Sequence, residues 1–193
     1  MFIKDWKKEI LTIPNLLSLF RLALLPVYVY IYLSATETYQ YVIAGSIMAV
    51  SCFTDMIDGK IARRYNMISN LGKILDPFAD KVTQFTLTLC LSVRYPVLNP
   101  VLILFVVKEF FQAVAGLVNL RRGKMLPGAL MAGKVCTTVL FVSLIALVLF
   151  PQMNPVFVDI IAAVDGIFLL FSFISYIFAY CGRNTKVQDL EQD

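Results

Sequence analysis

Six long stretches of apolar residues dominate this chain and limit what it can fold into. They cover residues 15–34, 41–60, 76–94, 98–119, 131–150 and 155–180. An α-helix needs about 20 residues to cross the hydrocarbon core of a bilayer, so each stretch is long enough to do so. Of the 193 residues, 59% are hydrophobic and 16% are charged, whereas a water-soluble domain carries about 25% charged residues. The sequence therefore predicts one integral membrane domain over residues 1–193, an all-α bundle of six transmembrane helices.

The segment before the first apolar run is amphipathic. Within residues 1–12, aromatic and aliphatic side chains recur at helical spacing among lysines. Helices of this kind lie in the headgroup region of a bilayer, so we expect a short interfacial helix here. A signal peptide fits less well, because Asn15, Ser18 and Arg21 interrupt the following run and no small-residue cleavage site follows.

The positions of lysine and arginine predict the orientation in the membrane. If the N-terminus is cytoplasmic, all of the 17 Lys and Arg residues except Arg94 fall on or near the cytoplasmic side. The positive-inside rule favours that orientation strongly. We therefore expect a multi-pass protein of the plasma membrane with both termini in the cytoplasm. The net charge of +4 then indicates a basic surface facing anionic lipid rather than nucleic acid.

The chain contains no histidine, which excludes several classes of active site. Ser-His and Cys-His catalytic groups and His-ligated metals cannot form. The four cysteines lie far apart, without the close spacing that zinc and redox sites need. A general base in this protein must therefore be a carboxylate, a lysine or a tyrosine.

Four aspartates lie at the ends of two neighbouring runs. Asp55 and Asp58 close the second run, and Asp76 and Asp80 open the third. Spacings of three and four residues place each pair on one face of a helix. Two antiparallel neighbouring helices can therefore direct four carboxylates into one space. Such an all-oxygen site suits Mg²⁺, Mn²⁺ or Ca²⁺ rather than zinc.

Two other interpretations compete with a metal site. The aspartates could pair with nearby lysines and arginines in a salt-bridged cytoplasmic rim, but the regular spacing of the whole set favours a common ligand. A divalent-cation transporter is the alternative from a different functional class. Transporters carry polar groups near the middle of the bilayer and commonly show repeated halves, and this sequence shows neither pattern.

The residues around these aspartates resemble the signature of the CDP-alcohol phosphatidyltransferases, D-x2-D-G-x2-A-R-x8-G-x3-D-x3-D. The matching positions are Asp55, Asp58, Gly59, Ala62, Arg63, Gly72, Asp76 and Asp80. The resemblance implies a homodimeric membrane enzyme whose active site opens to the cytoplasm. It also implies two divalent cations, Mg²⁺ or alternatively Mn²⁺, and CDP-diacylglycerol as the donor of a phosphatidyl group.

The resemblance further implies individual roles. Asp55, Asp58, Asp76 and Asp80 would bind the metals, and Asp80 would also act as the general base. Contacts to the CDP-linked lipid would come from Asn15, Leu16, Leu17, Ser18, Gly59, Ala62, Arg63 and Ser69.

The acceptor alcohol is less clearly indicated. Residues 13–21 and 75–81 look most like the phosphatidylglycerophosphate synthase branch, whose acceptor is sn-glycerol 3-phosphate. Its phosphate would contact Lys108, Arg121, Arg122 and Lys134, which we expect at the cytoplasmic face. That branch usually carries Arg-Glu in the fourth span and another Arg seven residues later, where this chain has Lys108-Glu109 and Gly116. A cardiolipin synthase of the CDP-alcohol type, with phosphatidylglycerol as acceptor, is the alternative.

One further carboxylate lies inside an apolar run. Asp165 falls within the sixth run, where an ionisable residue often indicates function. Asp165 is far in sequence from the four aspartates of the motif. We therefore expect it to bond to a neighbouring helix or to the partner subunit.

Overall fold

The structure, a computed structural model, describes residues 13–64, 72–121, 124–125, 131–181 and 188–189. Within these ranges the side chains of residues 13–14, 52–64, 72–74, 120, 124–125, 181 and 188–189 are not described. The expected interfacial helix over 1–12 lies outside the described residues, as do Ser69 and Arg122.

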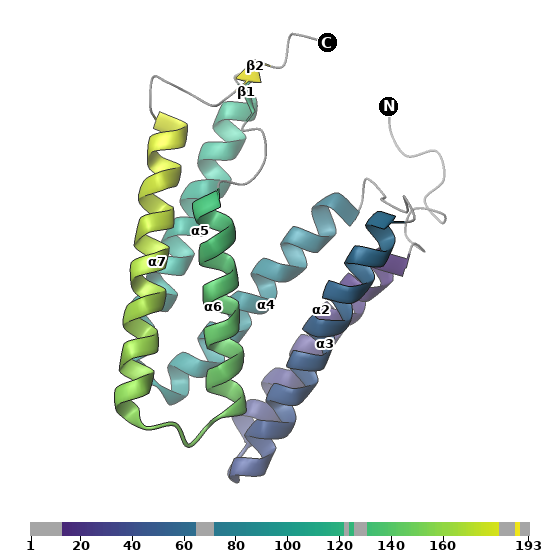
Figure 1. Cartoon of the computed structure of the whole chain (residues 1–193), viewed down its shortest axis with the longest axis vertical. Coiled ribbons are helices and arrows are strands. Elements are labelled where there is room, and N and C mark those ends of the chain that lie inside the picture. The colour runs from purple at the N-terminus through teal and green to yellow at the C-terminus, as the bar shows by residue number, and fades with distance from the viewer. Residues whose placement is uncertain (1–12, 65–71, 122–123, 126–130, 182–187, 190–193) are drawn as a thin grey trace. The chain divides into compact units, whose positions relative to one another are not determined.

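The described chain is helical in each of the six apolar runs, which confirms the all-α prediction (Figure 1). The helices are α2 (Ile13–Ser34), α3 (Thr38–Arg64), α4 (Gly72–Arg94), α5 (Asn99–Arg121), α6 (Met131–Leu149) and α7 (Pro155–Cys181). A single 3-10 turn, η1 (Pro96–Leu98), precedes α5. Helix α4 begins at Gly72 rather than at residue 76, so both of its aspartates lie inside the helix.

Four of the described helices are long and apolar enough to cross a membrane. These segments are Asn15–Ser34, Pro96–Asn119, Met131–Leu149 and Pro155–Tyr180. The chain is therefore a multi-pass membrane protein. Helices α3 and α4 differ from the other four because they carry the aspartates of the motif together with several basic residues.

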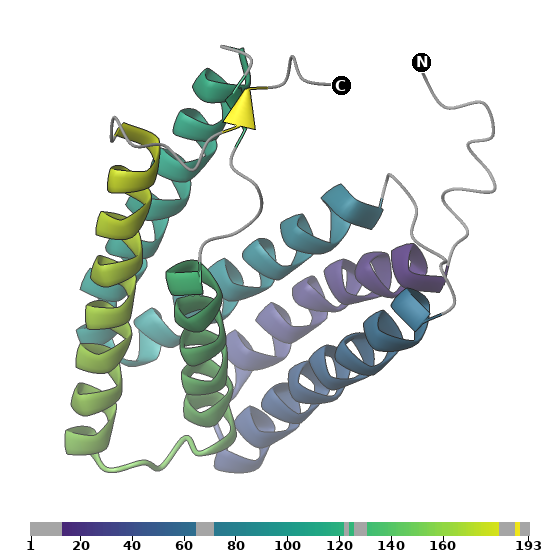
Figure 2. The ribbon, with the colours of Figure 1, turned by 45° about the horizontal axis from the view of Figure 1, so that its top comes forward.

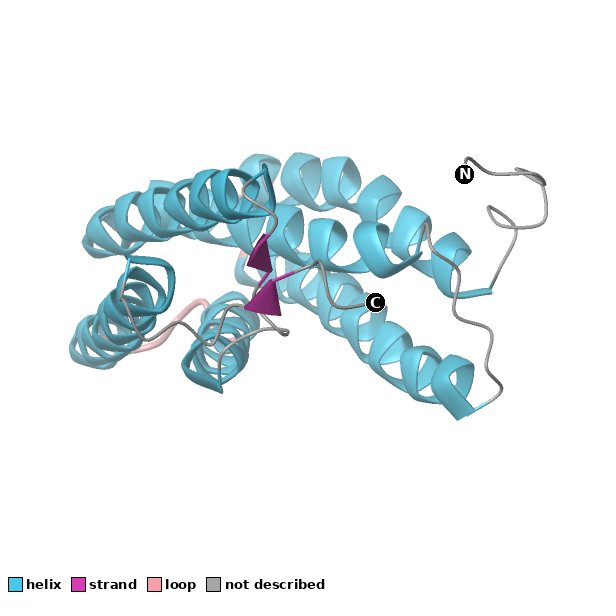
Figure 3. Ribbon diagram, turned by 90° about the horizontal axis from the view of Figure 1, so that it is seen from above, coloured by secondary structure: helices cyan, strands magenta, loops and turns pink. Residues whose placement is uncertain are grey.

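Two short strands are present that the sequence did not predict. Strand β1 (Lys124–Met125) pairs antiparallel with β2 (Gln188–Asp189), as the magenta arrows in Figure 3 show. The register sets Lys124 opposite Asp189 and Met125 opposite Gln188. Two-residue strands leave no periodic pattern in a sequence, which is why this pairing was not predicted.

The helices group into two compact units, residues 1–90 with 145–152 and residues 91–144 with 153–193. In the first unit, α2 and α3 lie side by side and antiparallel (Figure 2). Aromatic rings hold the end where they connect: Tyr32 lies 5.5 Å from Tyr28 and 5.1 Å from Tyr41, measured between ring centres. The Tyr41 hydroxyl donates a 2.8 Å hydrogen bond to the carbonyl oxygen of Ala35. These contacts fix the pairing of α2 with α3.

In the second unit, α5 packs against α7 through an edge-to-face contact between Phe111 and Phe173, whose ring centres are 5.4 Å apart. Helix α6 reaches α7 at Gly133. A Cβ atom at that position would lie 2.5 Å from the hydroxyl oxygen of Tyr176, so glycine allows the close approach. Cys136, one turn further along α6, is buried, as is Cys90 in the first unit.

The packing of α3 in the first unit generates a stability prediction. A Cβ atom on Gly45 would lie 2.8 Å from Val148 Cγ1 and 3.3 Å from the Val148 backbone, so Gly45→Leu should overpack this contact. We expect a loss of about 1–3 kcal/mol in the free energy of unfolding, read as a lower midpoint in thermal denaturation of the detergent-solubilised protein. Gly166→Leu is the matched control, because nothing lies within 4 Å of its Cβ position. Equal midpoints for the two variants would contradict this packing.

Candidate functional site

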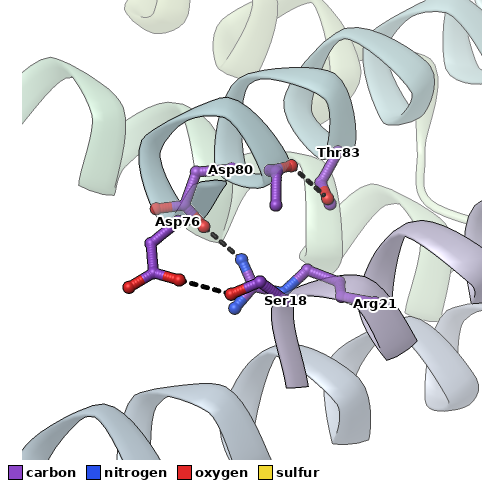
Figure 4. Close-up of polar contacts among 6 residues, drawn as sticks. Ser18, Arg21, Asp76, Asp80 and Thr83 are labelled. Atoms are coloured by element: carbon purple, nitrogen blue, oxygen red, sulfur yellow. Dashed lines mark hydrogen bonds and ion pairs between the residues drawn. The ribbon is translucent and has the colours of Figure 1, made fainter. Parts of the chain in front are cut away.

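Two aspartates of the motif lie on one face of α4. Asp76 and Asp80 are four residues apart, which is about one helical turn. Figure 4 shows both carboxylates turned to the same side, toward α2. The side chain of Asp80 is 50% exposed, so its carboxylate remains accessible to a ligand. Further along α4, the Thr83 hydroxyl donates a 2.8 Å hydrogen bond to the carbonyl oxygen of Ala79 within the same helix.

Helix α2 supplies a partner for each of these carboxylates. The Ser18 hydroxyl donates a hydrogen bond to Asp76 Oδ1, and Arg21 Nη1 donates to Asp80 Oδ1 and forms an ion pair with it (Figure 4). Ser18 and Arg21 are three residues apart and thus share a face of α2. Both are almost fully buried, with exposed fractions of 1% and 3%. The two helices are therefore joined by two polar contacts, one turn apart.

The stretch Asn15–Ser18, expected to contact the CDP-linked lipid, does not present a single surface. Asn15 is buried on the same side as Ser18, whereas Leu16 is exposed. Leu17 faces a third direction and lines an apolar groove of about 390 Å³ between α2 and α3. The groove is lined by Leu17, Phe20, Leu24, Ser46, Ile47, Val50 and Ser51.

The other two aspartates lie in the last part of α3. The backbone of Asp55, Asp58, Gly59, Ala62 and Arg63 is helical, and their side chains lie outside the described residues. Ser51 of α3 and Leu17 of α2 line the same groove, and the two helices are antiparallel. The turn of α3 that follows Ser51, which carries Asp55, therefore lies toward the same end of this unit as the first turns of α2.

The donor atoms in this region suit a hard divalent cation. Asp76 and Asp80 provide oxygen ligands from one helix face, and the half-exposed carboxylate of Asp80 is open to an incoming ion. Among the residues whose side chains are described, no three acidic or cysteine side chains gather into a complete metal site. A complete set of ligands would require carboxylates from α3 as well.

The cations expected to bind an acceptor phosphate have different surroundings. Arg121, in the last turn of α5, and Lys134, in the first turn of α6, are exposed. Lys108 instead lies in the middle of α5 with 2% exposure, rather than at the cytoplasmic face. Its ammonium nitrogen lies 2.6 Å from Glu109 Oε1 and 5.8 Å from the centre of the Tyr176 ring. Lys108 is therefore enclosed and already paired.

Arg21 is the site residue that the sequence analysis did not identify. In the sequence, Arg21 was recognised only as a polar residue that interrupts the first apolar run. It was also part of residues 13–21, which resemble the phosphatidylglycerophosphate synthase branch. A stronger signal was present, because a charged residue inside a membrane helix needs a partner. The sequence alone could not show which of the four aspartates that partner would be.

Comparison with known proteins places these residues in a family. The family model for CDP-alcohol phosphatidyltransferases matches residues 11–178. A probable phosphatidylglycerophosphate synthase of Mycobacterium tuberculosis is 31% identical over 85% of this chain and 78% of its own length. A CDP-diacylglycerol–glycerol-3-phosphate 3-phosphatidyltransferase of Aquifex aeolicus is 35% identical over 69% of this chain and 72% of its own length.

The similarity to cardiolipin synthases is more local. A putative cardiolipin synthase of Mycobacterium bovis is 44% identical over 42% of this chain, and the chain spans 37% of that protein. The family match nevertheless includes α2, α3 and α4 and therefore all four aspartates of the motif. By the extent of that match, the chain belongs to the CDP-alcohol phosphatidyltransferase family.

Proposed function

We propose that this protein transfers the phosphatidyl group of CDP-diacylglycerol to the hydroxyl group of sn-glycerol 3-phosphate. The products are phosphatidylglycerophosphate and CMP. The observation that carries the proposal is the pair Asp76 and Asp80, which share one face of α4 next to the polar face of α2. The family match and the longer alignments with phosphatidylglycerophosphate synthases support the same activity.

In this proposal Asp55, Asp58, Asp76 and Asp80 hold two divalent cations, Mg²⁺ or alternatively Mn²⁺. The charge of four carboxylates balances that of two such ions. When bound, the cations neutralise the diphosphate of the substrate and the charge that develops as CMP leaves.

The remaining chemistry belongs to side chains of the protein. An alcohol is a weak nucleophile, so a base must remove its proton as the oxygen attacks the β-phosphorus. Asp80 takes this role, because its carboxylate is half exposed and one of its oxygens is already fixed by Arg21. As the new P–O bond forms, the bond from the β-phosphorus to the bridging oxygen breaks and CMP departs. Arg63 would bind phosphate oxygens with its planar fork.

The exposed positions of Arg121 and Lys134 suit the phosphate of glycerol 3-phosphate. Lys108 suits it less, because it is buried and Glu109 neutralises it. The burial and pairing of Lys108 favour a cardiolipin synthase as the second candidate function. Phosphatidylglycerol carries no terminal phosphate, so fewer free cations would be needed for its recognition.

We further propose that all six helices cross the plasma membrane, with both termini and the acidic site on the cytoplasmic side. The one-sided distribution of lysine and arginine supports this orientation. In it, α3 and α4 place their aspartates at the inner interface, where water-soluble substrates can reach them. The family resemblance supports a homodimer.

The assignment of Asp80 generates the first functional prediction. Asp80→Asn should lower Mg²⁺-dependent CMP release from CDP-diacylglycerol by roughly 10²–10⁴-fold, because the amide cannot accept the proton. Binding of CDP-diacylglycerol should be largely retained, as measured by titration of the purified protein. Asp159→Asn, an exposed position near the start of α7, is the matched control and should keep full turnover.

One result would contradict the role of Asp80, and another would contradict the proposed enzymatic activity. Unchanged turnover in Asp80→Asn would show that another group is the base. Metal-dependent ion flux through proteoliposomes without any CMP release would favour the transporter alternative instead.

The acceptor assignment generates a second prediction. Purified protein supplied with CDP-diacylglycerol should release CMP with glycerol 3-phosphate, and not with phosphatidylglycerol, serine or inositol phosphate. Lys134→Gln should raise the KM for glycerol 3-phosphate by roughly tenfold, since a charged hydrogen bond is lost, and leave the KM for CDP-diacylglycerol unchanged. CMP release with phosphatidylglycerol alone would identify a cardiolipin synthase.

A further inference from the structure

Arg21 lies where a charge is costly. It is nine positions into the apolar helix α2, about 12 Å along the axis from Ile13. Only 3% of its surface is exposed. A guanidinium in such a place persists when a carboxylate compensates its charge, and Asp80 does so here. The ion pair is therefore a requirement for α2 rather than an incidental surface contact.

The two members of this pair are held very differently. The side chain of Arg21 is 4% exposed and that of Asp80 is 50% exposed. The guanidinium is thus fixed by its surroundings, whereas the carboxylate is open on its other side. In such a pair the buried member sets the position of the open one. Arg21 therefore determines where Asp80 Oδ1 lies, while half of the Asp80 side chain stays exposed.

The neighbouring contact reinforces this geometry. Ser18 holds Asp76 one turn away, so two donors on α2 engage two carboxylates on α4 (Figure 4). Both contacts use the Oδ1 atom and are formed by buried donors. Ser18 is neutral, however, and Arg21 is the one that places a positive charge against these carboxylates.

We propose that Arg21 is a positioning residue that holds Asp80 in its working orientation and competes with divalent cations for its carboxylate. This inference rests on the proposed function, in which Asp80 is both a metal ligand and the general base. A fixed guanidinium repels an approaching divalent cation, because like charges a few ångströms apart interact strongly in a partly buried site. Arg21 therefore weakens metal binding while it improves turnover.

These opposite effects distinguish the proposal from a purely structural ion pair. If Arg21 only joined α2 to α4, its removal would loosen the carboxylates and weaken both metal binding and turnover. If it competes with the cations, its removal leaves Asp80 more available to them, and metal binding becomes tighter although turnover falls.

The test measures Mn²⁺ affinity on the full-length protein in nanodiscs, with free Mn²⁺ followed by electron paramagnetic resonance. Arg21→Gln should bind Mn²⁺ roughly three- to tenfold more tightly than the wild type, since a repelling charge is lost. Its CMP release at saturating Mg²⁺ should fall at least roughly tenfold, because Asp80 is no longer held. Arg94→Gln removes the same charge about 20 Å away along α4 and should change neither quantity.

Arg21→Lys separates the effect of the positive charge at position 21 from the effect of the guanidinium geometry. It also replaces Arg21→Gln in the test if that variant does not fold. Lysine keeps the charge but lacks the planar fork, so Mn²⁺ affinity should stay within about twofold of the wild type while CMP release falls severalfold. Weaker Mn²⁺ binding in either variant, or unchanged affinity in folded Arg21→Gln, would overturn the proposal. A wild type that binds no Mn²⁺ at the acidic site would instead overturn the proposed function, and Asp76→Asn serves to locate that binding.

Discussion

The need to compensate charge inside an apolar helix determines how the first unit is built. Helix α2 is long and apolar enough to cross a membrane, yet it buries Arg21 almost completely. Hydrocarbon offers no solvation to a guanidinium, so the face of α2 that carries it must meet a carboxylate. That face continues as Leu25, Tyr28 and Tyr32, all of which are buried. One ion pair at one end and a group of aromatic rings at the other thus determine which side of α2 faces the protein.

The same rule operates within the second unit, with different residues. Lys108 is buried in α5, and its charge is met by Glu109 on the same helix and by the face of the Tyr176 ring. Gly133 allows α6 to come close enough to enclose that ring. Asp165 of α7 is buried against Ser143 of α6, and among the described residues it forms no hydrogen bond of normal geometry. For Lys108, by contrast, Glu109 and the Tyr176 ring compensate the charge within the second unit. The contact with Tyr176 joins α5 to α7.

Sequence periodicity identified what depends on one helix at a time. The six helices follow from the apolar runs, and the shared face of Asp76 and Asp80 follows from their spacing. Contacts between helices could not be predicted from periodicity, because each of them depends on two helices that are distant in the sequence. The pairing of Arg21 with Asp80 spans 59 positions, and four aspartates were equivalent candidates for it. The burial of Lys108 was missed for a similar reason, because the position of a lysine in a run does not show whether its side chain reaches the interface. The β1–β2 contact involves too few residues to leave any pattern.

The proposed chemistry gives a reason why a cation should stand so close to the general base. On that proposal, four carboxylates and two divalent cations are neutral together, and the diphosphate of the substrate then adds negative charge to a site bordered by hydrocarbon. A fixed positive group beside the carboxylates reduces this excess without having to be recruited from water, and a preorganised charge loses nothing to reorganisation as the reaction proceeds. Arg21 is such a group, since its side chain is almost fully buried and already faces Asp80. Because Arg21 faces Asp80 rather than solvent, its charge would act where the proposed base accepts the proton, and the same contact that compensates the charge of Arg21 in α2 would also orient that base.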